Sequence, residues 1–159
     1  MKADVGELNT QLINKLIVNK LHISTAESCT GGLLSALLTQ VPGASEVLNE
    51  CIVTYSNEAK MRELGVRKET LEAYGAVSEE TAYEMCTGIC RHTGSDVGIG
   101  ITGIAGPGGG TKEKPVGTVC IGVCTKDKIN ISTQHFEGDR DKVRESSCIF
   151  ALSKTLEML

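Results

Sequence analysis

The feature that most constrains the fold is the alternation of helical patterns with short apolar ones. Helical spacing of apolar residues marks residues 8–17, 33–41, 56–65 and 69–74, a stretch beginning at Ser78 and one beginning near Asp139. The short segments are rich in β-branched residues and predict strands: "LHIST", "CIVTY", "DVGIGITGI", "TVCIGVCT" and "INISTQHF". We therefore predict one three-layer α/β/α domain over residues 1–159, with helices on both faces of a mixed, mostly parallel sheet that ends in an antiparallel hairpin.

Two segments also carry an expectation about burial. Residues 33–41 have no polar face, which is typical of a helix enclosed in a core. The segment "CIVTY" is short and rich in β-branched residues, and we expect it to be a buried strand.

Charge and hydropathy exclude several classes of protein. The formal net charge is −4 with both signs scattered along the chain, so we expect no nucleic-acid partner. No run of about 18 apolar residues occurs, so we expect no membrane partner. The first residues lack the pattern of a signal peptide, and we expect a cytoplasmic location. The seven cysteines include no C-x-x-C pair, and we interpret them as free thiols rather than ligands of a metal or members of a disulfide framework.

Polar and glycine residues follow three of the predicted strands. They form the segments 27–32, 55–60 and 102–110. In open α/β sheets, ligands bind beyond the carboxyl ends of the strands. The sequence therefore predicts a site where these three segments meet.

Ser28 precedes a strongly apolar helix in the stretch "TAESCTGG". A nucleophile at a helix N-terminus gains a lowered pKa, and the free N–H groups there can hold an oxyanion. Two other interpretations remain open. Ser28 or Thr30 could simply cap the helix, and Cys29 is a rival nucleophile because thiolates are intrinsically reactive.

Lys60 is the candidate base. It lies in the first turns of a helix for which Ser56 or Asn57 is the expected N-cap, and burial there would lower its pKa. An ordinary exposed helical lysine is the alternative. His22, His92 and His135 are placed poorly for a Ser–His–Asp triad, because His22 begins its strand and His92 ends a helix.

The third predicted strand, which runs into a glycine-rich loop, contains Gly98, Gly100 and Gly103 in the pattern G-x-G-x-x-G. We reject a dinucleotide-binding interpretation, because the pattern must open a helix and Pro107 with three further glycines follows instead. Two interpretations remain: a loop whose backbone N–H groups close on an anion, or a flexible surface connection.

Two arginines, Arg140 and Arg144, lie four residues apart on the last predicted helix. Two guanidinium groups on one helix face suit a phosphate. A local ion-pair network with Asp139 and Asp141 is the alternative.

Five stretches together resemble the C-terminal domain of the CinA (competence/damage-inducible) family. They are "AESCTGG", "VTYSNEAK", "GVRKETLEAYGAVSEE", "ITGIAGPGGGTKEKPVGTV" and "GDRDKVR". They occur in the order and with the spacing of that family, over roughly residues 25–159.

The resemblance implies an activity: hydrolysis of the carboxamide of nicotinamide mononucleotide to nicotinate mononucleotide and ammonia, by a serine–lysine mechanism without a metal or other cofactor. It implies that Ser28 is the nucleophile, Lys60 the base, and Tyr55 and Thr102 further catalytic residues. Substrate binding falls to Arg140 and to main-chain groups, which are those of Thr30, Gly31, Gly106, Gly108 and Gly109.

Other functions remain open at this stage. The same pocket could hold a nucleotide without turning it over, as a regulatory module of the competence or DNA-damage type would. The partner we expect is a small pyridine nucleotide, and we expect a homo-oligomer.

Overall fold

The computed structural model describes residues 4–159. Its helices are α1 (Val5–Asn19), α2 (Leu33–Thr39), α3 (Asn57–Leu64), α4 (Lys68–Tyr74), α5 (Glu79–Thr93) and α6 (Arg140–Met158), with a short 3-10 helix at Ala44–Glu46. Its strands are β1 (Ile23–Glu27), β2 (Leu48–Val53), β3 (Val97–Gly103), β4 (Thr118–Cys124) and β5 (Ile129–His135). They form one sheet in the order β2-β1-β3-β4-β5.

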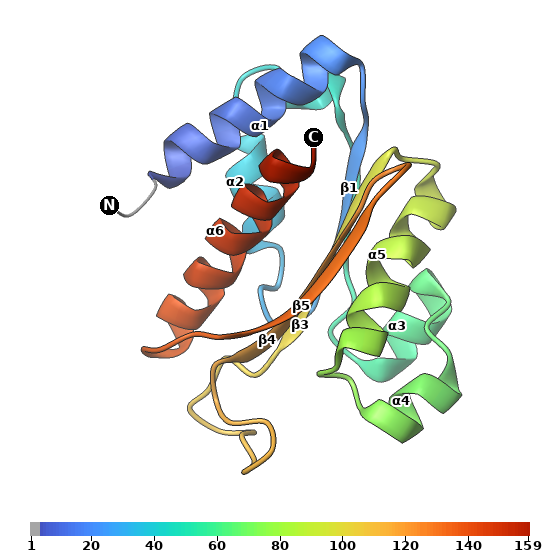
Figure 1. The fold of residues 1–159 in the computed structure, drawn as a ribbon, viewed down its shortest axis with the longest axis vertical. Helices are drawn as coiled ribbons and strands as arrows, with labels where there is room; N and C mark the ends of the chain where they lie inside the picture. Colours follow the sequence, from blue (N-terminus) through green and yellow to red (C-terminus); the bar gives the residue numbers. More distant parts are fainter. Residues whose placement is uncertain (1–3) are drawn as a thin grey trace.

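The sheet lies between two layers of helices (Figure 1). Helices α1, α2 and α6 cover one face, and α3, α4 and α5 cover the other. Strands β2, β1 and β3 are parallel, whereas β4 and β5 form an antiparallel hairpin beside β3. The predicted α/β/α class and the terminal hairpin are confirmed.

The apolar core is divided by the sheet into two parts. The larger part contains Leu12, Ile13 and Leu16 of α1 and the inward side of α6, packed on β1, β3 and β4. The smaller part lies under α5 and includes Met85 and Ile89. Both parts consist of aliphatic and sulfur-containing side chains, as the scarcity of aromatic residues requires.

Both expectations about burial are wrong, as is one strand boundary. Strand β2 is largely exposed, because it is an edge strand paired only with β1. Helix α2 buries only Leu34 and Leu38, because one side of it faces solvent. Strand β1 begins two residues later than predicted and extends through Glu27, which is fully buried.

The glycines of β3 allow α5 to lie directly on the sheet. A Cβ atom on Gly98 would approach the Cys86 carbonyl oxygen to 2.5 Å, and one on Gly100 would approach the Cys86 amide nitrogen to 2.8 Å. Neither distance is possible without moving the helix. Two glycines of the G-x-G-x-x-G pattern thus serve helix–sheet packing.

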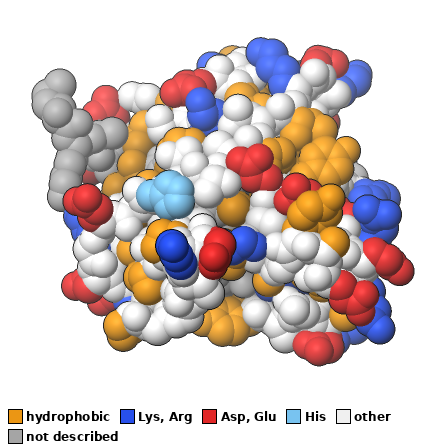
Figure 2. Space-filling view, turned by 60° about the horizontal axis from the view of Figure 1, so that its bottom comes forward, with side chains coloured by type: hydrophobic (Ala, Val, Ile, Leu, Met, Phe, Trp, Pro, Cys, Tyr) orange, Lys and Arg blue, Asp and Glu red, His pale blue; other side chains and the backbone are white. Residues whose placement is uncertain are grey.

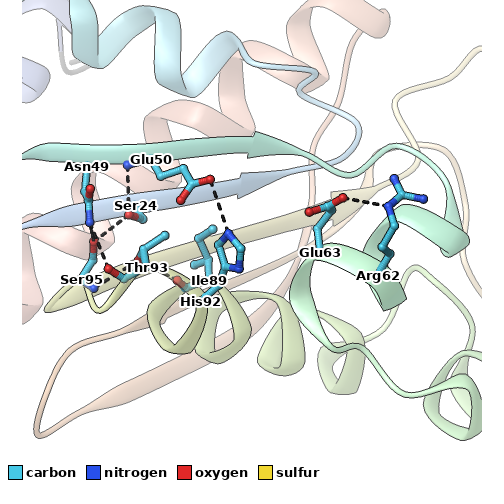
Figure 3. A network of polar contacts seen from close by, with 9 residues as sticks. All are labelled: Ser24, Asn49, Glu50, Arg62, Glu63, Ile89, His92, Thr93 and Ser95. Carbon is cyan, nitrogen blue, oxygen red and sulfur yellow. Dashed lines mark hydrogen bonds and ion pairs between the residues drawn. The ribbon is translucent and has the colours of Figure 1, made fainter.

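A polar network closes the amino ends of the parallel strands (Figure 3). Ser24 Oγ on β1 lies 2.7 Å from Ser95 Oγ, and the Asn49 side chain of β2 donates to Ser95 Oγ at 3.1 Å and to the Thr93 carbonyl at 3.2 Å. Glu50 donates its main-chain N–H to Ser24 Oγ at 3.3 Å. The network joins β1, β2 and the segment before β3.

In the part of the chain that the structure describes, no helix combines the length and the apolar character that crossing a bilayer requires.

Candidate active site

The three segments identified in the sequence meet at the carboxyl ends of the parallel strands. The Ser28 amide donates to the Ile101 carbonyl at 2.9 Å and the Thr54 amide to the Glu27 carbonyl at 2.9 Å, which joins the ends of β1, β2 and β3. A cavity of about 290 Å³ opens there. Its wall includes eight of the ten predicted site residues: Ser28, Tyr55, Lys60, Thr102, Gly106, Gly108, Gly109 and Arg140.

Ser28 and Lys60 are in contact at the base of this cavity. Lys60 Nζ lies 3.1 Å from Ser28 Oγ, and it donates hydrogen bonds to the carbonyl oxygens of Thr54 at 2.8 Å and Tyr55 at 3.4 Å. The Lys60 side chain is 1% exposed, so the alternative of a solvated surface lysine is excluded.

Burial determines the protonation chemistry of Lys60. Desolvation lowers its pKa below the ordinary value of 10.5, because the charged form loses its hydration. A neutral amine has two N–H bonds and one lone pair. The carbonyls of Thr54 and Tyr55 can accept the two hydrogens, which leaves the lone pair for the hydroxyl proton of Ser28.

Local sequence explains the position of Lys60. Ser56 caps α3 by accepting a hydrogen bond from the Ala59 amide at 3.1 Å, and Gly65 ends the helix in a left-handed conformation. Asn57 is the first helical residue rather than the cap, and it lines the cavity. The sequence indicated Asn57 only as a possible cap and gave no sign of its place in the cavity wall.

The helix after Ser28 is capped by Glu27 rather than by Ser28 or Thr30. Glu27 Oε1 accepts a hydrogen bond from the Leu34 amide at 2.9 Å. Glu27 Oε2 accepts two from Ser35, one from its amide at 3.1 Å and one from its hydroxyl at 2.5 Å. The residue at the N-cap position is Gly32, whose side chain offers no acceptor. The alternative in which Ser28 or Thr30 caps the helix is therefore wrong. Glu27 lies six residues before the first residue of α2, a spacing from which the sequence did not predict a cap.

Thr30 and Gly31 lie outside the cavity wall. Thr30 is fully buried, and its hydroxyl has no hydrogen-bond partner among residues 4–159. The Gly31 amide donates to the Ser28 carbonyl at 3.0 Å and is thereby occupied within the turn. The structure thus brings the turn to the site without placing these two residues against the cavity.

The rival nucleophile Cys29 also lines the cavity, but its environment opposes thiolate formation. Its side chain is buried, and desolvation raises the pKa of the thiol to about 11. A thiol with that pKa is almost entirely protonated near neutrality. The Lys60 amine, 3.1 Å from Ser28 Oγ, favours Ser28 over Cys29 as the nucleophile.

Arg140 joins two other walls of the cavity. Its guanidinium donates to the Gly106 carbonyl at 2.8 Å and to the Tyr55 hydroxyl at 3.1 Å. It lies at the first residue of α6, where the helix dipole also favours an anion. Thr102, at the end of β3, donates its hydroxyl to the Ala76 carbonyl at 2.8 Å.

The glycine-rich loop is held at two points, which contradicts its interpretation as a purely flexible connection. Arg140 binds it at Gly106, and Lys114 Nζ donates to the Tyr74 carbonyl at 2.6 Å. Gly106 and Gly109 have positive φ angles of 88° and 86°, which only glycine adopts readily.

Arg144 does not join Arg140 in the cavity wall. It donates from Nε to the Cys29 carbonyl at 3.2 Å and from Nη2 to the Thr30 carbonyl at 3.0 Å. It also lies 3.7 Å from a carboxylate oxygen of Asp141. The expected pair of arginines on one phosphate is therefore not formed.

Charges of both signs are scattered over the face at the carboxyl ends of the strands. Figure 2 shows the face at the carboxyl ends of the strands, where acidic and basic side chains are interspersed with uncharged surface. Within residues 4–159, no three histidine, cysteine, aspartate or glutamate side chains are arranged to hold a metal ion.

The fold and the buried serine–lysine contact define an α/β protein with a cavity at the carboxyl ends of its parallel strands. The model of the CinA C-terminal domain family matches residues 5–159, and the chain belongs to this family.

Relatives and solved structures agree with that assignment. The chain is 52% identical to a putative competence-damage inducible protein of Clostridium novyi over 92% of its own length, and 60% identical to one of Clostridium acetobutylicum over 81%. It spans only about a third of those relatives, 36% and 31%.

Two crystal structures from the same superfamily resemble the fold closely. The competence/damage inducible protein CihA of Agrobacterium tumefaciens has a TM-score of 0.95 at 37% identity, covering 99% of this chain and 97% of that one. A competence or damage-inducible protein of Enterobacter asburiae has a TM-score of 0.95 at 41% identity, covering 99% of both chains.

Proposed function

We propose that this chain hydrolyses the carboxamide of nicotinamide mononucleotide, giving nicotinate mononucleotide and ammonia. The observation that carries the proposal is the 3.1 Å contact between Lys60 Nζ and Ser28 Oγ inside the cavity. An amine of lowered pKa beside a hydroxyl is the arrangement that activates a serine for acyl transfer.

The reaction proceeds in two stages. Neutral Lys60 takes the hydroxyl proton as Ser28 Oγ attacks the carboxamide carbon, and main-chain N–H groups hold the resulting oxyanion. The C–N bond then breaks, and protonated Lys60 returns its proton to the departing ammonia. Water then attacks the acyl carbon with Lys60 again as base. The bond to Ser28 Oγ breaks, Lys60 returns the proton to Ser28, and nicotinate mononucleotide leaves.

The substrate phosphate is assigned to Arg140 and the loop at 106–109. A guanidinium group at the first residue of a long helix, with glycine N–H groups beside it, supplies both charge and directed donors. The cavity of about 290 Å³ suits a small ligand whose sugar and phosphate extend toward the opening. Tyr55 and Thr102 line the space between the phosphate end and Ser28.

The test is ammonia release from purified protein incubated with nicotinamide mononucleotide. We expect turnover in the wild type and its loss in both Ser28→Ala and Lys60→Ala. Cys29→Ala is the matched control and should retain activity within about threefold. Binding of the nucleotide without ammonia release would contradict the proposal and support the regulatory module instead. Activity that survives in Ser28→Ala but is lost in Cys29→Ala would reassign the nucleophile.

The proposal also includes a cytoplasmic location and a homo-oligomeric state. Light scattering coupled to size-exclusion chromatography measures the second directly, and a monomer at micromolar concentration would contradict it.

A further inference from the structure

One polar side chain in the cavity wall has all of its hydrogen-bonding groups unused. Six side chains of the wall carry oxygen or nitrogen. Five of them form hydrogen bonds within the protein: Ser28, Tyr55, Lys60, Thr102 and Arg140. The sixth is Asn57, whose side chain makes no hydrogen bond within residues 4–159. Its carboxamide therefore keeps both N–H donors and its carbonyl acceptor for a ligand.

The position of Asn57 in α3 holds it near the reacting groups. It is the first residue of the helix, and the cap role belongs to Ser56, whose hydroxyl accepts from the Ala59 amide at 3.1 Å. Lys60 follows three residues later on the same side of the helix. Tyr55 lies two residues before Asn57, a span of at most about 7 Å, and its carbonyl accepts from Lys60 Nζ at 3.4 Å. Asn57 and the Lys60 amine therefore lie close together on one wall.

Exposure rises along this wall from the base of the cavity to its opening. Lys60 is 1% exposed, Asn57 is exposed, and Tyr55 is 62% exposed. The Tyr55 hydroxyl accepts a hydrogen bond from Arg140, the side chain to which the substrate phosphate is assigned. Asn57 therefore belongs to the outer part of the wall, where a ligand entering from solvent can reach its amide.

The proposed substrate has a ribose between its carboxamide and its phosphate. With the carboxamide carbon at Ser28 Oγ and the phosphate at Arg140, the ribose occupies the space between these two residues. Its 2′ and 3′ hydroxyls lie side by side, and each can donate and accept a hydrogen bond. A primary amide presents an N–H and a carbonyl oxygen side by side, which matches such a diol.

We propose that Asn57 binds the ribose diol of the substrate and thereby selects ribonucleotides over nucleotides that lack these hydroxyls. This inference rests on the proposed function, which supplies the placement of the two ends of the substrate. A site that hydrogen-bonds a hydroxyl rejects an analogue without it, because the polar group of the site then loses its partner. Since Asn57 is exposed, water can replace that partner in part, and the discrimination should be moderate.

The experiment is a double-mutant cycle between the protein and the substrate. Wild type and Asn57→Ala are each assayed with nicotinamide mononucleotide and with its 2′,3′-dideoxyribose analogue, and the acid formed is quantified by chromatography. Glu58→Gln is the matched control, because Glu58 is the next residue of α3, is exposed and lies outside the cavity wall. Thermal melting reports the folding of each variant. Calorimetric titration with both nucleotides measures binding independently of turnover.

We expect the wild type to favour the ribonucleotide over the analogue by about 10- to 50-fold in kcat/KM, because two neutral hydrogen bonds are lost with the diol. Asn57→Ala should lose a similar factor on the ribonucleotide and less than about threefold on the analogue. Its preference between the two should therefore fall below about threefold. Glu58→Gln should behave as the wild type with both nucleotides, and the Kd values should follow the same pattern.

Three outcomes would overturn the proposal. They are a wild type that does not discriminate between the two nucleotides, a preference that persists in Asn57→Ala, and an equal loss on both nucleotides, which would mean that Asn57 supports the helix instead. If the wild type binds the nucleotides but releases no ammonia, the proposed reaction is wrong, and the ratios of Kd values still decide the role of Asn57. A wild type that neither binds nor hydrolyses them overturns both proposals.

Discussion

At the amino ends of the parallel strands, Ser24, Asn49 and Ser95 satisfy one another's hydrogen bonds, whereas at the carboxyl ends Ser28 and Lys60 face a cavity. All of these side chains except Asn49 are buried, and both sets join neighbouring strands. The two sets differ in whether their polar groups are all hydrogen-bonded to one another. The network at the amino ends stabilises the sheet, whereas the Lys60 amine, whose pKa is lowered, lies beside a hydroxyl with which it can exchange a proton.

Unpaired buried hydroxyls near the site bear on this contrast. Thr30 Oγ1 and Thr54 Oγ1 are buried without a hydrogen-bond partner in residues 4–159, and both lie in the segments that follow β1 and β2. Buried polar atoms are normally paired. The other two unpaired atoms among residues 4–159, Asn9 Oδ1 and Asn130 Oδ1, lie on α1 and β5, so unpaired groups are not confined to the site.

The largest effect is expected for Lys60→Met. This change keeps most of the side-chain volume and removes the base, so kcat/KM for the proposed amide substrate should fall by at least about 10³-fold while the protein stays folded. Ammonia release measures kcat/KM, and circular dichroism shows whether the variant is folded. An active Lys60→Met variant would show that Lys60 is not the base, and the carboxyl ends of the strands would then have no catalytic lysine to distinguish them from the amino ends.

The pH dependence of activity should report the same lysine. Only neutral Lys60 can accept the proton of Ser28, so kcat/KM should rise about tenfold per pH unit on the acid side and level off above the pKa of Lys60. Because burial lowers that pKa, the plateau should begin below pH 10.5. A profile that still rises at that pH would show that Lys60 titrates as an ordinary surface amine.

Stability should follow pH in a related way. Between the lowered pKa of folded Lys60 and the value of 10.5 for the unfolded chain, the unfolded state binds more protons, so the free energy of unfolding rises with pH. Lys60→Met lacks this contribution. The free energy of unfolding of the wild type, relative to that of Lys60→Met, should therefore increase with pH across that window. Denaturant titrations at several pH values measure this difference.

A smaller effect is expected for Arg140→Gln. Loss of a charged donor to a phosphate should raise KM for the mononucleotide by about 10- to 100-fold, the equivalent of one charge-assisted hydrogen bond. Nicotinamide riboside lacks the phosphate and serves as the internal control, since its kcat/KM should change much less. Equal losses for both substrates would mean that Arg140 acts by holding Tyr55 and Gly106 in place.

The smallest effect on activity is expected at the opposite end. Ser95→Ala removes a buried hydroxyl that contacts Ser24 and Asn49, and it should lower the free energy of unfolding by about 1–2 kcal/mol with kcat/KM unchanged. Glu50→Gln, which weakens only the exposed contact with His92 (Figure 3), is the matched control and should cost less than about 0.5 kcal/mol. A large loss of activity in Ser95→Ala would show that the two ends are coupled.

Sequence patterns predicted the order of elements well because that information is local. Helices α5 and α6 begin next to Ser78 and Asp139 as expected, and each of these residues caps its helix. The hairpin of β4 and β5 follows from two apolar segments with a short turn. The exposure of β2 was not predictable in this way. An apolar strand has the same composition at the edge of a sheet as in its centre, and only its neighbours decide its burial.

The site was predicted in outline for the same reason. Strand ends brought Ser28, Lys60 and the glycine-rich loop to one edge, but the near-complete burial of Lys60 depends on how α3 packs. The position of Arg144 depends on contacts across more than a hundred residues of sequence. No local pattern encodes such contacts.

The absence of side chains on Gly98 and Gly100 has a consequence for how this family of folds could diverge. These residues fix the distance between α5 and the sheet, and the segment preceding α5 supplies Ala76 and Val77 to the cavity wall, where Ala76 accepts the Thr102 hydroxyl. A single added methyl group beneath the helix would lift that wall. The width of the pocket therefore depends on Gly98 and Gly100, which do not line the cavity. A substitution at either position could change which substrates fit.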